Sequence, residues 1–269
     1  MSSRTTTAQG FASRILSKSG VARLFGILLA FAGWTALSIV FPHDLMPLPH
    51  VALLETWTLV ESGVVYPHLS ATIWRALFGF SGAMMLGITF GVFMGLTNYG
   101  RHFLTPWVII GLSIPGVAWG AVMTLIVGYN NTAPIMAAVL TVFPYVAVNI
   151  WKGVENIEQP LIEMSSSFDV SPLRILLRLI IPNIAPSLFT ASRFGLAISW
   201  RIVVITEIFS ANTGIGIKII KTYNNFRFHE AWAWAIVFML LILVIEYGVF
   251  RPLERWMYTY RQDVKSVGF

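Results

Sequence analysis

Charge and cysteine are what this sequence has least of. Its 269 residues include no cysteine, so disulfides and thiolate metal sites are excluded. Asp, Glu, Lys and Arg make up 11% of the chain, whereas an ordinary soluble domain has about 25%. Hydrophobic residues make up 56%, and the mean hydropathy is +0.73. A chain that cannot cover its surface with charge is solvated by lipid, so the composition predicts an integral membrane protein.

Histidine pairs at metal-ligand spacing are also absent. The chain has five scattered histidines: His43, His50, His68, His102 and His229. We therefore expect no metal site and no cofactor. The sequence pI near 9.8 is compatible with nucleic-acid binding, but cytoplasmic loops of membrane proteins are normally rich in Lys and Arg. Because the charges fall in such loops, we expect membrane lipid as a partner and no nucleic acid.

The N-terminal region begins basic and then turns apolar. Residues 1–22 carry basic side chains and no acid, which predicts a cytoplasmic tail. The start resembles a signal peptide, and Ala30-Phe31-Ala32 imitates a cleavage site. However, the apolar stretch of about 23–41 continues through Val40, which is too long for a signal core and close to the roughly 20 residues that cross a bilayer. We interpret it as an uncleaved first span.

Five further apolar stretches predict an all-α membrane protein of about six spans. They are about 74–97, 105–127, 133–151, 187–209 and 231–251. Gly87, Gly91 and Gly95 in the second span are four residues apart, and small residues on one face let helices approach closely in lipid. Pro115 and Pro144 lie inside predicted spans, where neighbouring helices accommodate the freed carbonyl groups.

The distribution of Lys and Arg predicts the orientation. With the N-terminus inside, the cytoplasmic segments hold most of the basic residues, as membrane proteins require. The loop 42–66 is then outside, with a short helix over Val51 to Leu59. The predicted organisation is a cytoplasmic tail (1–22), a transmembrane domain (23–253) with a cytoplasmic insert (155–186), and a cytoplasmic tail (254–269).

The insert 155–186 is polar, Ser-rich and charged, in contrast to the sequence around it. Ser171 followed by Pro172 is typical of an N-cap with proline at the first helical position, and the helix is expected to continue to Ile181. A second short helix is predicted from Leu161 to Phe168. Two such helices would make a protruding knob for a soluble partner. The alternative is a plain solvated loop between spans.

The insert resembles the cytoplasmic signature of permease subunits of bacterial ATP-binding-cassette (ABC) importers. That signature reads Glu-Ala-Ala, three residues, Gly, nine residues, then Ile-x-Leu-Pro. Here Glu163-Met164-Ser165 takes the first place and Leu179-Ile180-Ile181-Pro182 the last, at the same spacing. Asp169 stands where the glycine is expected. Glycine takes a positive φ freely whereas aspartate tolerates it at some cost, so the turn is expected to differ in shape.

Other stretches resemble the nitrate, sulfonate, taurine and bicarbonate branch of these permeases. They are Ser113 to Trp119, Trp200 to Glu207, and Gly214-Ile215-Gly216. The resemblance implies a bacterial inner-membrane subunit of the type I importer fold, a second permease copy and an extracytoplasmic binding protein. It implies separate ATPase subunits, since this chain has no phosphate-binding Gly-x-x-x-x-Gly-Lys-Ser/Thr loop. The implied ATPase-coupling residues are Glu163, Met164, Ser165, Ser166, Phe168, Asp169 and Pro182.

The fifth span carries charges that need a reason, because an ionisable residue at the centre of a span costs about 2.5–3.5 kcal/mol on insertion scales. Arg193, Trp200 and Glu207 are seven apart and share one stripe, and Arg201 is turned roughly 80–100° from it. One interpretation is that these four residues line the translocation path and that Arg201 meets an anionic solute. The other is that Arg193 and Glu207 reach the two membrane surfaces while Arg201 pairs inside the bundle. Glu246 in the sixth span is expected to pair within the bundle.

The sequence thus predicts a transport subunit without catalysis of its own, for a small anionic solute.

 The expected solutes are of the sulfonate, taurine, nitrate or bicarbonate kind, and a pyrimidine-type vitamin precursor is the alternative within the family. Lys218, Lys221 and Arg227 either steer such an anion, meet an acidic binding protein, or form a solvated rim. The competing class is a secondary carrier or channel driven by an ion gradient. A membrane-embedded enzyme would need clustered His, Asp and Glu at the membrane surface, which the sequence lacks.

Overall fold

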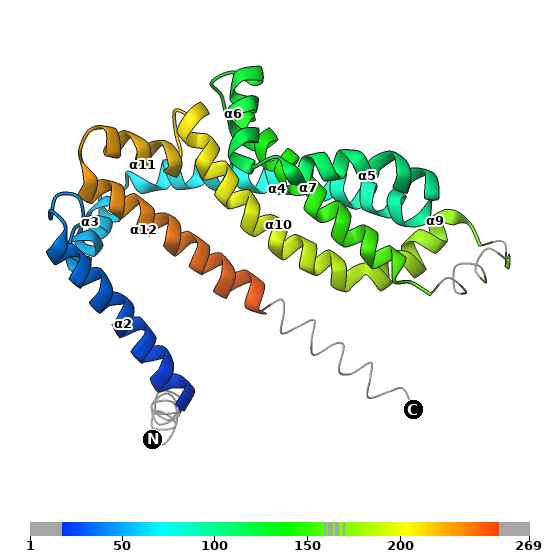
Figure 1. Ribbon diagram of the computed structural model, residues 1–269, viewed down its shortest axis with the longest axis horizontal. Coiled ribbons are helices and arrows are strands. Elements are labelled where there is room, and N and C mark those ends of the chain that lie inside the picture. The colour runs from blue at the N-terminus through cyan, green and yellow to red at the C-terminus, as the bar shows by residue number, and fades with distance from the viewer. Residues whose placement is uncertain (1–17, 159, 161–163, 165–166, 169, 253–269) are drawn as a thin grey trace, which may run out of the picture.

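The computed structural model describes residues 18–158, 160, 164, 167–168 and 170–252, and this part of the chain is helical without a strand (Figure 1). The predicted all-α class is confirmed. The helices are α2 (Lys18–Val40), α3 (Pro49–Glu61), α4 (Val65–Leu96), α5 (Asn98–Ser113), α6 (Gly116–Val127), α7 (Thr132–Glu155), α9 (Pro172–Ile175), α10 (Ile181–Ser210), α11 (Ile215–Asn224) and α12 (Phe228–Ile245). The π-helical turns η1 (Leu176–Ile180) and η2 (Glu246–Phe250) follow α9 and α12.

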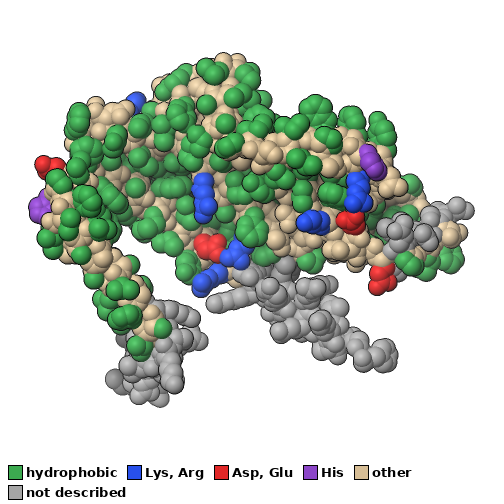
Figure 2. Space-filling model, viewed as in Figure 1, with side chains coloured by type: hydrophobic (Ala, Val, Ile, Leu, Met, Phe, Trp, Pro, Cys, Tyr) green, Lys and Arg blue, Asp and Glu red, His purple; other side chains and the backbone are tan. Residues whose placement is uncertain are grey.

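Four helical segments of the described chain are long and apolar enough to cross a membrane: α4, α7, the continuous segment Pro172–Ser210, and the segment Phe228–Phe250. The bent pair α5 and α6 adds a fifth candidate span, and α2 contributes a shorter apolar helix, Leu24–Val40. This count is close to the predicted six. Figure 2 shows hydrophobic side chains over most of the visible face, with the charged ones in a few groups, as expected for a surface that lipid covers.

The third predicted span differs from the expectation, because it is broken at Pro115. Helices α5 and α6 meet at an angle of 98°. Ile114 is extended (φ −82°, ψ 122°), the conformation that a following proline favours, and Pro115 occupies the N-cap position of α6. Pro115 therefore separates two helices instead of lying inside one. Pro144 does lie inside α7, as predicted.

Helices α4 and α7 form the centre of the bundle and run parallel. The glycine stripe of α4 lies directly against α7: a Cβ atom added at Gly87 would be 2.5 Å from the Cβ of Val146, and one at Gly95 would be 2.5 Å from that of Val154. The contact residue on α7 moves from Val146 to Val154 as the glycine on α4 moves from Gly87 to Gly95, so the two helix axes point in the same direction. The predicted role of the stripe in close helix packing is confirmed.

Helix α10 runs antiparallel to α4 and α7, from the polar insert to the opposite end of an elongated molecule (Figure 1). Its first turns pack against Gly153 of α7, and Gly195 in its middle lies against Val142 of α7. We call the end that holds α9 and the insert the insert end, and the end that holds α3 and α11 the α11 end (Figure 1). The sequence predicts that the insert end faces the cytoplasm. The predicted surface helix at Val51 to Leu59 is α3, at the α11 end.

Candidate functional site

The second helix of the insert begins at the predicted residue. Ser171 occupies the N-cap position, and Pro172 is the first residue of α9. The Ser171 carbonyl accepts hydrogen bonds from the backbone N–H groups of Arg174 (2.9 Å) and Ile175 (3.1 Å). No loop follows α9: the chain passes through η1 into α10, so the insert and the fifth span form one continuous helical segment.

The first half of the insert is described only in part. Phe168 N–H donates to the Met164 carbonyl at 3.2 Å, which is one helical turn within the predicted helix Leu161 to Phe168. Of the predicted coupling residues, four lie outside the described part of the chain: Glu163, Ser165, Ser166 and Asp169. The three that are described, Met164, Phe168 and Pro182, are all exposed.

The second half of the insert and the residues just before it expose several apolar and basic side chains. Met164 is 54% exposed and Phe168 75%, and Leu173 and Leu177 are also exposed. We call these four residues, together with the exposed Arg174 and Arg178, the coupling surface. An exposed apolar patch with a polar rim is typical of a protein interaction site.

An ion pair anchors the start of the insert. Arg101, in the first turns of α5, lies 3.1 Å from the Glu155 carboxylate at the end of α7. The Arg101 guanidinium also stacks over the Trp151 ring, 5.0 Å from its centroid. Both charges are half-exposed, so the pair contributes position more than stability.

The four predicted path residues of α10 lie in different surroundings. Arg193 is partly exposed and its guanidinium contacts the Glu246 carboxylate of η2, so Glu246 pairs within the bundle as expected. Trp200 is buried in an apolar cluster with Met123. Arg201 is exposed and forms no ion pair or hydrogen bond in the part of the chain that the structure describes.

Glu207, the fourth of these residues, forms a buried ion pair with Arg75 of α4. Arg75 Nη1 donates to Glu207 Oε1 at 2.6 Å, and the two side chains are 4% and 0% exposed. The Thr72 hydroxyl contacts both carboxylate oxygens, at 2.9 and 3.0 Å. Two buried charges are tolerated only when they are paired and hydrogen-bonded, and this pair is. Glu207 therefore faces α4, not the membrane surface.

The same side chains hold the beginning of α11. Three successive backbone N–H groups, at the start of a helix where they have no intrahelical acceptor, donate to side chains of α4 and α10. Gly214 N donates to His68 Nδ1, Ile215 N to Thr72 Oγ1, and Gly216 N to Glu207 Oε2, each at 3.0 Å. We call His68, Thr72, Arg75 and Glu207 the clamp.

Arg75 extends the clamp to two further segments. Its Nη1 donates to the Thr213 carbonyl at 2.6 Å, and its Nη2 donates to Thr213 Oγ1 at 3.0 Å and Asn131 Oδ1 at 2.6 Å. Nothing in the sequence alone assigns a role to Arg75, because the residues that it contacts are far from it along the chain. The local signals were the Gly-Ile-Gly after Glu207 and the spacing of His68, Thr72 and Arg75, which places them on one face of a helix.

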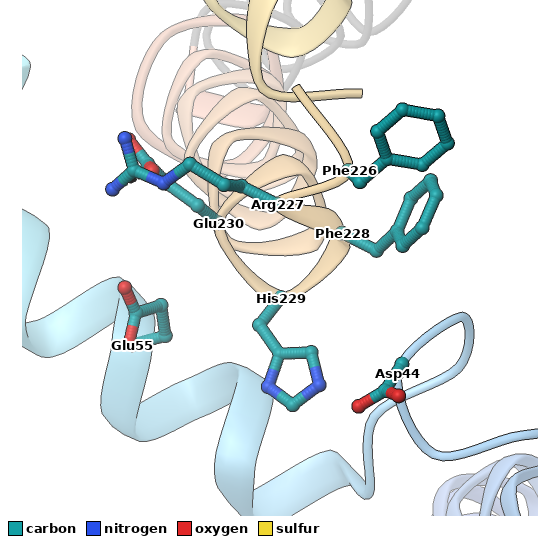
Figure 3. A pocket seen from close by; sticks show the side chains of 7 residues that line it. All are labelled: Asp44, Glu55, Phe226, Arg227, Phe228, His229 and Glu230. Atoms are coloured by element: carbon teal, nitrogen blue, oxygen red, sulfur yellow. Dashed lines mark ion pairs between the residues drawn. The ribbon is translucent and has the colours of Figure 1, made fainter. Parts of the chain in front are cut away.

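A cleft of about 470 Å³ opens at the α11 end, between the beginning of α12 and the region of α3 (Figure 3). Its lining is Asp44, Glu55, Phe226, Arg227, Phe228, His229 and Glu230. Arg227 is ion-paired with Glu230, so one of the three predicted outer basic residues is neutralised. Because three carboxylates line the cleft, it disfavours an anion.

The apolar helices, the parallel α4–α7 core and the insert define a multi-pass membrane protein of the transport permease class. The chain belongs to the family of binding-protein-dependent transport system inner membrane components, whose sequence profile matches residues 87–257. It is therefore a transport subunit of the bacterial inner membrane, and the resemblance to ABC importer permeases is confirmed.

Two relatives from Escherichia coli strain K12 identify the branch. The chain is 33% identical over 190 residues, 70% of each chain, to SsuC, which is named as an aliphatic sulfonates transport permease. It is 26% identical over 239 residues, 86% of each chain, to the taurine transport system permease TauC. A chain of the MetNI methionine ABC transporter, solved in inward-facing conformations, has the same fold: the TM-score is 0.57 at 20% identity, covering 74% of this chain and 96% of that one.

Proposed function

We propose that this chain forms the translocation path of an ABC importer for a small organic anion of the sulfonate or taurine kind. A binding protein delivers the solute at the α11 end, and separate ATPase subunits dock on the coupling surface. Two copies of the chain assemble in the membrane, with lipid around them. The names of SsuC and TauC support the solute class. The observation that carries the proposal is the coupling surface, where exposed Met164 and Phe168 precede the continuous helical segment Pro172–Ser210.

Arg201 is the residue that we assign to the solute. It lies about two-thirds of the way along the 30-residue helix α10, inside the predicted span 187–209, exposed and without a partner in the described chain. A charged side chain at that depth is expensive in lipid, so it is expected to face an aqueous path or a second copy of the chain. A guanidinium there fits a sulfonate, whose oxygens accept hydrogen bonds from its planar fork.

The coupling surface is tested by co-purification with the partner ATPase. Phe168→Asp is expected to lower recovery of the ATPase at least about tenfold, because a desolvated carboxylate in a docking groove is unfavourable. Phe226→Asp is the matched control: Phe226 is 81% exposed but lies at the α11 end, so recovery should stay unchanged. Glu163→Arg is expected to act like Phe168→Asp. Equal recovery with Phe168→Asp and Phe226→Asp would contradict the assignment of the coupling surface.

A further inference from the structure

We propose that Glu207 and Arg75 are positioning residues, which fix α11 to the ends of α4 and α10 so that movement at the coupling surface reaches the α11 end. This proposal rests on the proposed function, because it needs an ATPase to drive the coupling surface. Neither residue is required to touch the solute.

The first step is that α11 has no cap of its own. Its N-cap residue is Gly214, which has no side chain, and the N–H groups of residues 214–216 all donate to the clamp. The acceptors come from α4 and α10. Because hydrogen bonds are directional, three of them on successive residues fix both the position and the rotation of a helix end.

The second step is that the fit is tight enough to exclude alternatives. A Cβ atom at Gly214 would lie 2.3 Å from Glu207 Cδ, and one at Gly216 would lie 2.0 Å from the Val204 carbonyl oxygen. The beginning of α11 is thus in van der Waals contact with α10. Apolar side chains of similar volume would fill this space, but the ion pair and its hydrogen bonds also specify one arrangement.

The third step is that α10 connects both ends of the molecule. The helical segment Pro172–Ser210 has 39 residues, which corresponds to about 58 Å at 1.5 Å per residue. Leu173 and Leu177 of the coupling surface lie at its beginning, and Glu207 lies in its last turn. A tilt applied at the coupling surface therefore displaces Glu207, and the clamp carries α11 with it.

The fourth step is that movement of α11 displaces the side chains that it packs against and those that it exposes. Ile215 of α11 and Trp234 of α12 belong to one buried apolar cluster, and the Lys218 ammonium lies 5.7 Å from the centre of the Trp234 ring. The outward side of α11 carries exposed Lys221 and Tyr223. The clamp thus sets where these side chains stand for a soluble partner at this end.

Positioning is tested by thiol labelling, which the absence of native cysteine makes simple. Thr222→Cys reports on a buried site of α11, 4% exposed, and Asn224→Cys is the exposed control on the same helix. In lipid nanodiscs, adding Glu207→Gln should raise the maleimide labelling rate at the Thr222→Cys site at least about tenfold and leave the Asn224→Cys site unchanged. An unchanged rate at the Thr222→Cys site overturns the positioning role.

General unfolding is detected at Ala138→Cys, which lies at the α4–α7 contact with 0% exposure and must stay protected. If the Ala138→Cys site becomes labelled, Glu207→Gln has unfolded the protein, and the positioning role is then tested by a cross-link in the chain that keeps Glu207. Asn131→Cys and Thr213→Cys replace two exposed side chains that contact the same Arg75 nitrogen. Because the clamp stays closed as α10 moves, the cross-linked complex should keep its binding-protein-stimulated ATPase rate within about twofold. Abolition of that rate overturns the proposal.

Transmission is tested on the full complex with its ATPase and binding protein. Glu207→Gln should lower the ratio of the ATPase rates with and without binding protein at least about fivefold, while the ATPase still co-purifies. An unchanged ratio overturns transmission through the clamp. If the wild-type chain binds no ATPase at all, the proposed function fails, and the labelling result still decides the positioning role.

Discussion

At Gly214 the backbone and its neighbour both demand glycine. Its φ is +129°, a region that L side chains rarely adopt, and its α carbon faces the Glu207 carboxylate. Gly128 also has a positive φ, +84°, but nothing lies within 4 Å of the place where its Cβ would be. Substitution of Gly128 therefore tests backbone strain alone, whereas substitution of Gly214 tests backbone strain together with a steric clash.

Gly214→Ala is expected to destabilise the protein more than Gly128→Ala does. Strain at a positive φ costs about 1–3 kcal/mol. At Gly214 displacement of Glu207 adds to it, so the thermal midpoint in detergent should fall by about 5 °C or more. Thermal aggregation followed by size-exclusion chromatography measures both variants. If both midpoints fall equally, the contact with Glu207 contributes nothing.

Arg201 gives a second prediction for a single side chain. Arg201→Gln should lower uptake of labelled taurine at least about tenfold in the reconstituted complex, because it removes the cation that we propose meets the sulfonate. Arg201→Lys keeps the charge and loses the planar fork, so it should retain part of the uptake. The control is assembly with the ATPase, which both variants should keep. Uptake unaffected by Arg201→Gln would contradict this assignment and favour the alternative, that Arg201 pairs inside the bundle.

At the scale of helices, the contact between α4 and α7 depends on the absence of side chains. A Cβ atom at Gly87 would lie 2.5 Å from Val146 Cβ and 2.9 Å from the Phe143 carbonyl oxygen. Gly87→Ala should therefore cost about 1–3 kcal/mol through overpacking. Gly33→Ala in α2, where nothing lies within 4 Å, should be neutral or slightly stabilising because alanine favours helix. Unfolding midpoints of the two variants measure the difference, and equal midpoints would contradict the packing role.

Local patterns in the sequence account for much of these helices. Apolar length predicts the spans, the glycine spacing predicts a packing face, and Ser171-Pro172 predicts where α9 begins. The break at Pro115 was missed because a proline inside a span is often accommodated, and only the position of α6 against Ile202 decides otherwise. The clamp was missed because Arg75 and Glu207 are 132 residues apart, and periodicity shows which residues share a face but not which helix they meet.

At the scale of the whole molecule, the proposed function requires a connection between two ends. The coupling surface and α11 lie at opposite ends of the molecule, and α10 is the helix that reaches from one toward the other (Figure 1). The charges of α10 are arranged along this length: Arg193 is held by Glu246, Glu207 is held by Arg75, and Arg201 between them is unpaired within the described residues. The one charge of α10 without a partner in the described residues is the one that we propose meets the solute, and the paired Glu207 is the one that we propose holds α11.

The source of energy separates an ABC importer from a secondary carrier. Liposomes that contain the permease, its ATPase and internal ATP should take up taurine only when binding protein is outside. Collapse of the proton gradient by an uncoupler should change the rate by less than about twofold, because the described part of α10 holds no carboxylate other than the clamped Glu207 to relay protons. Liposomes with the permease alone serve as the control and should show no uptake. Uptake by the permease alone, driven by an imposed ion gradient, would identify the protein as a secondary carrier. The coupling surface would then not be needed to dock an ATPase for transport.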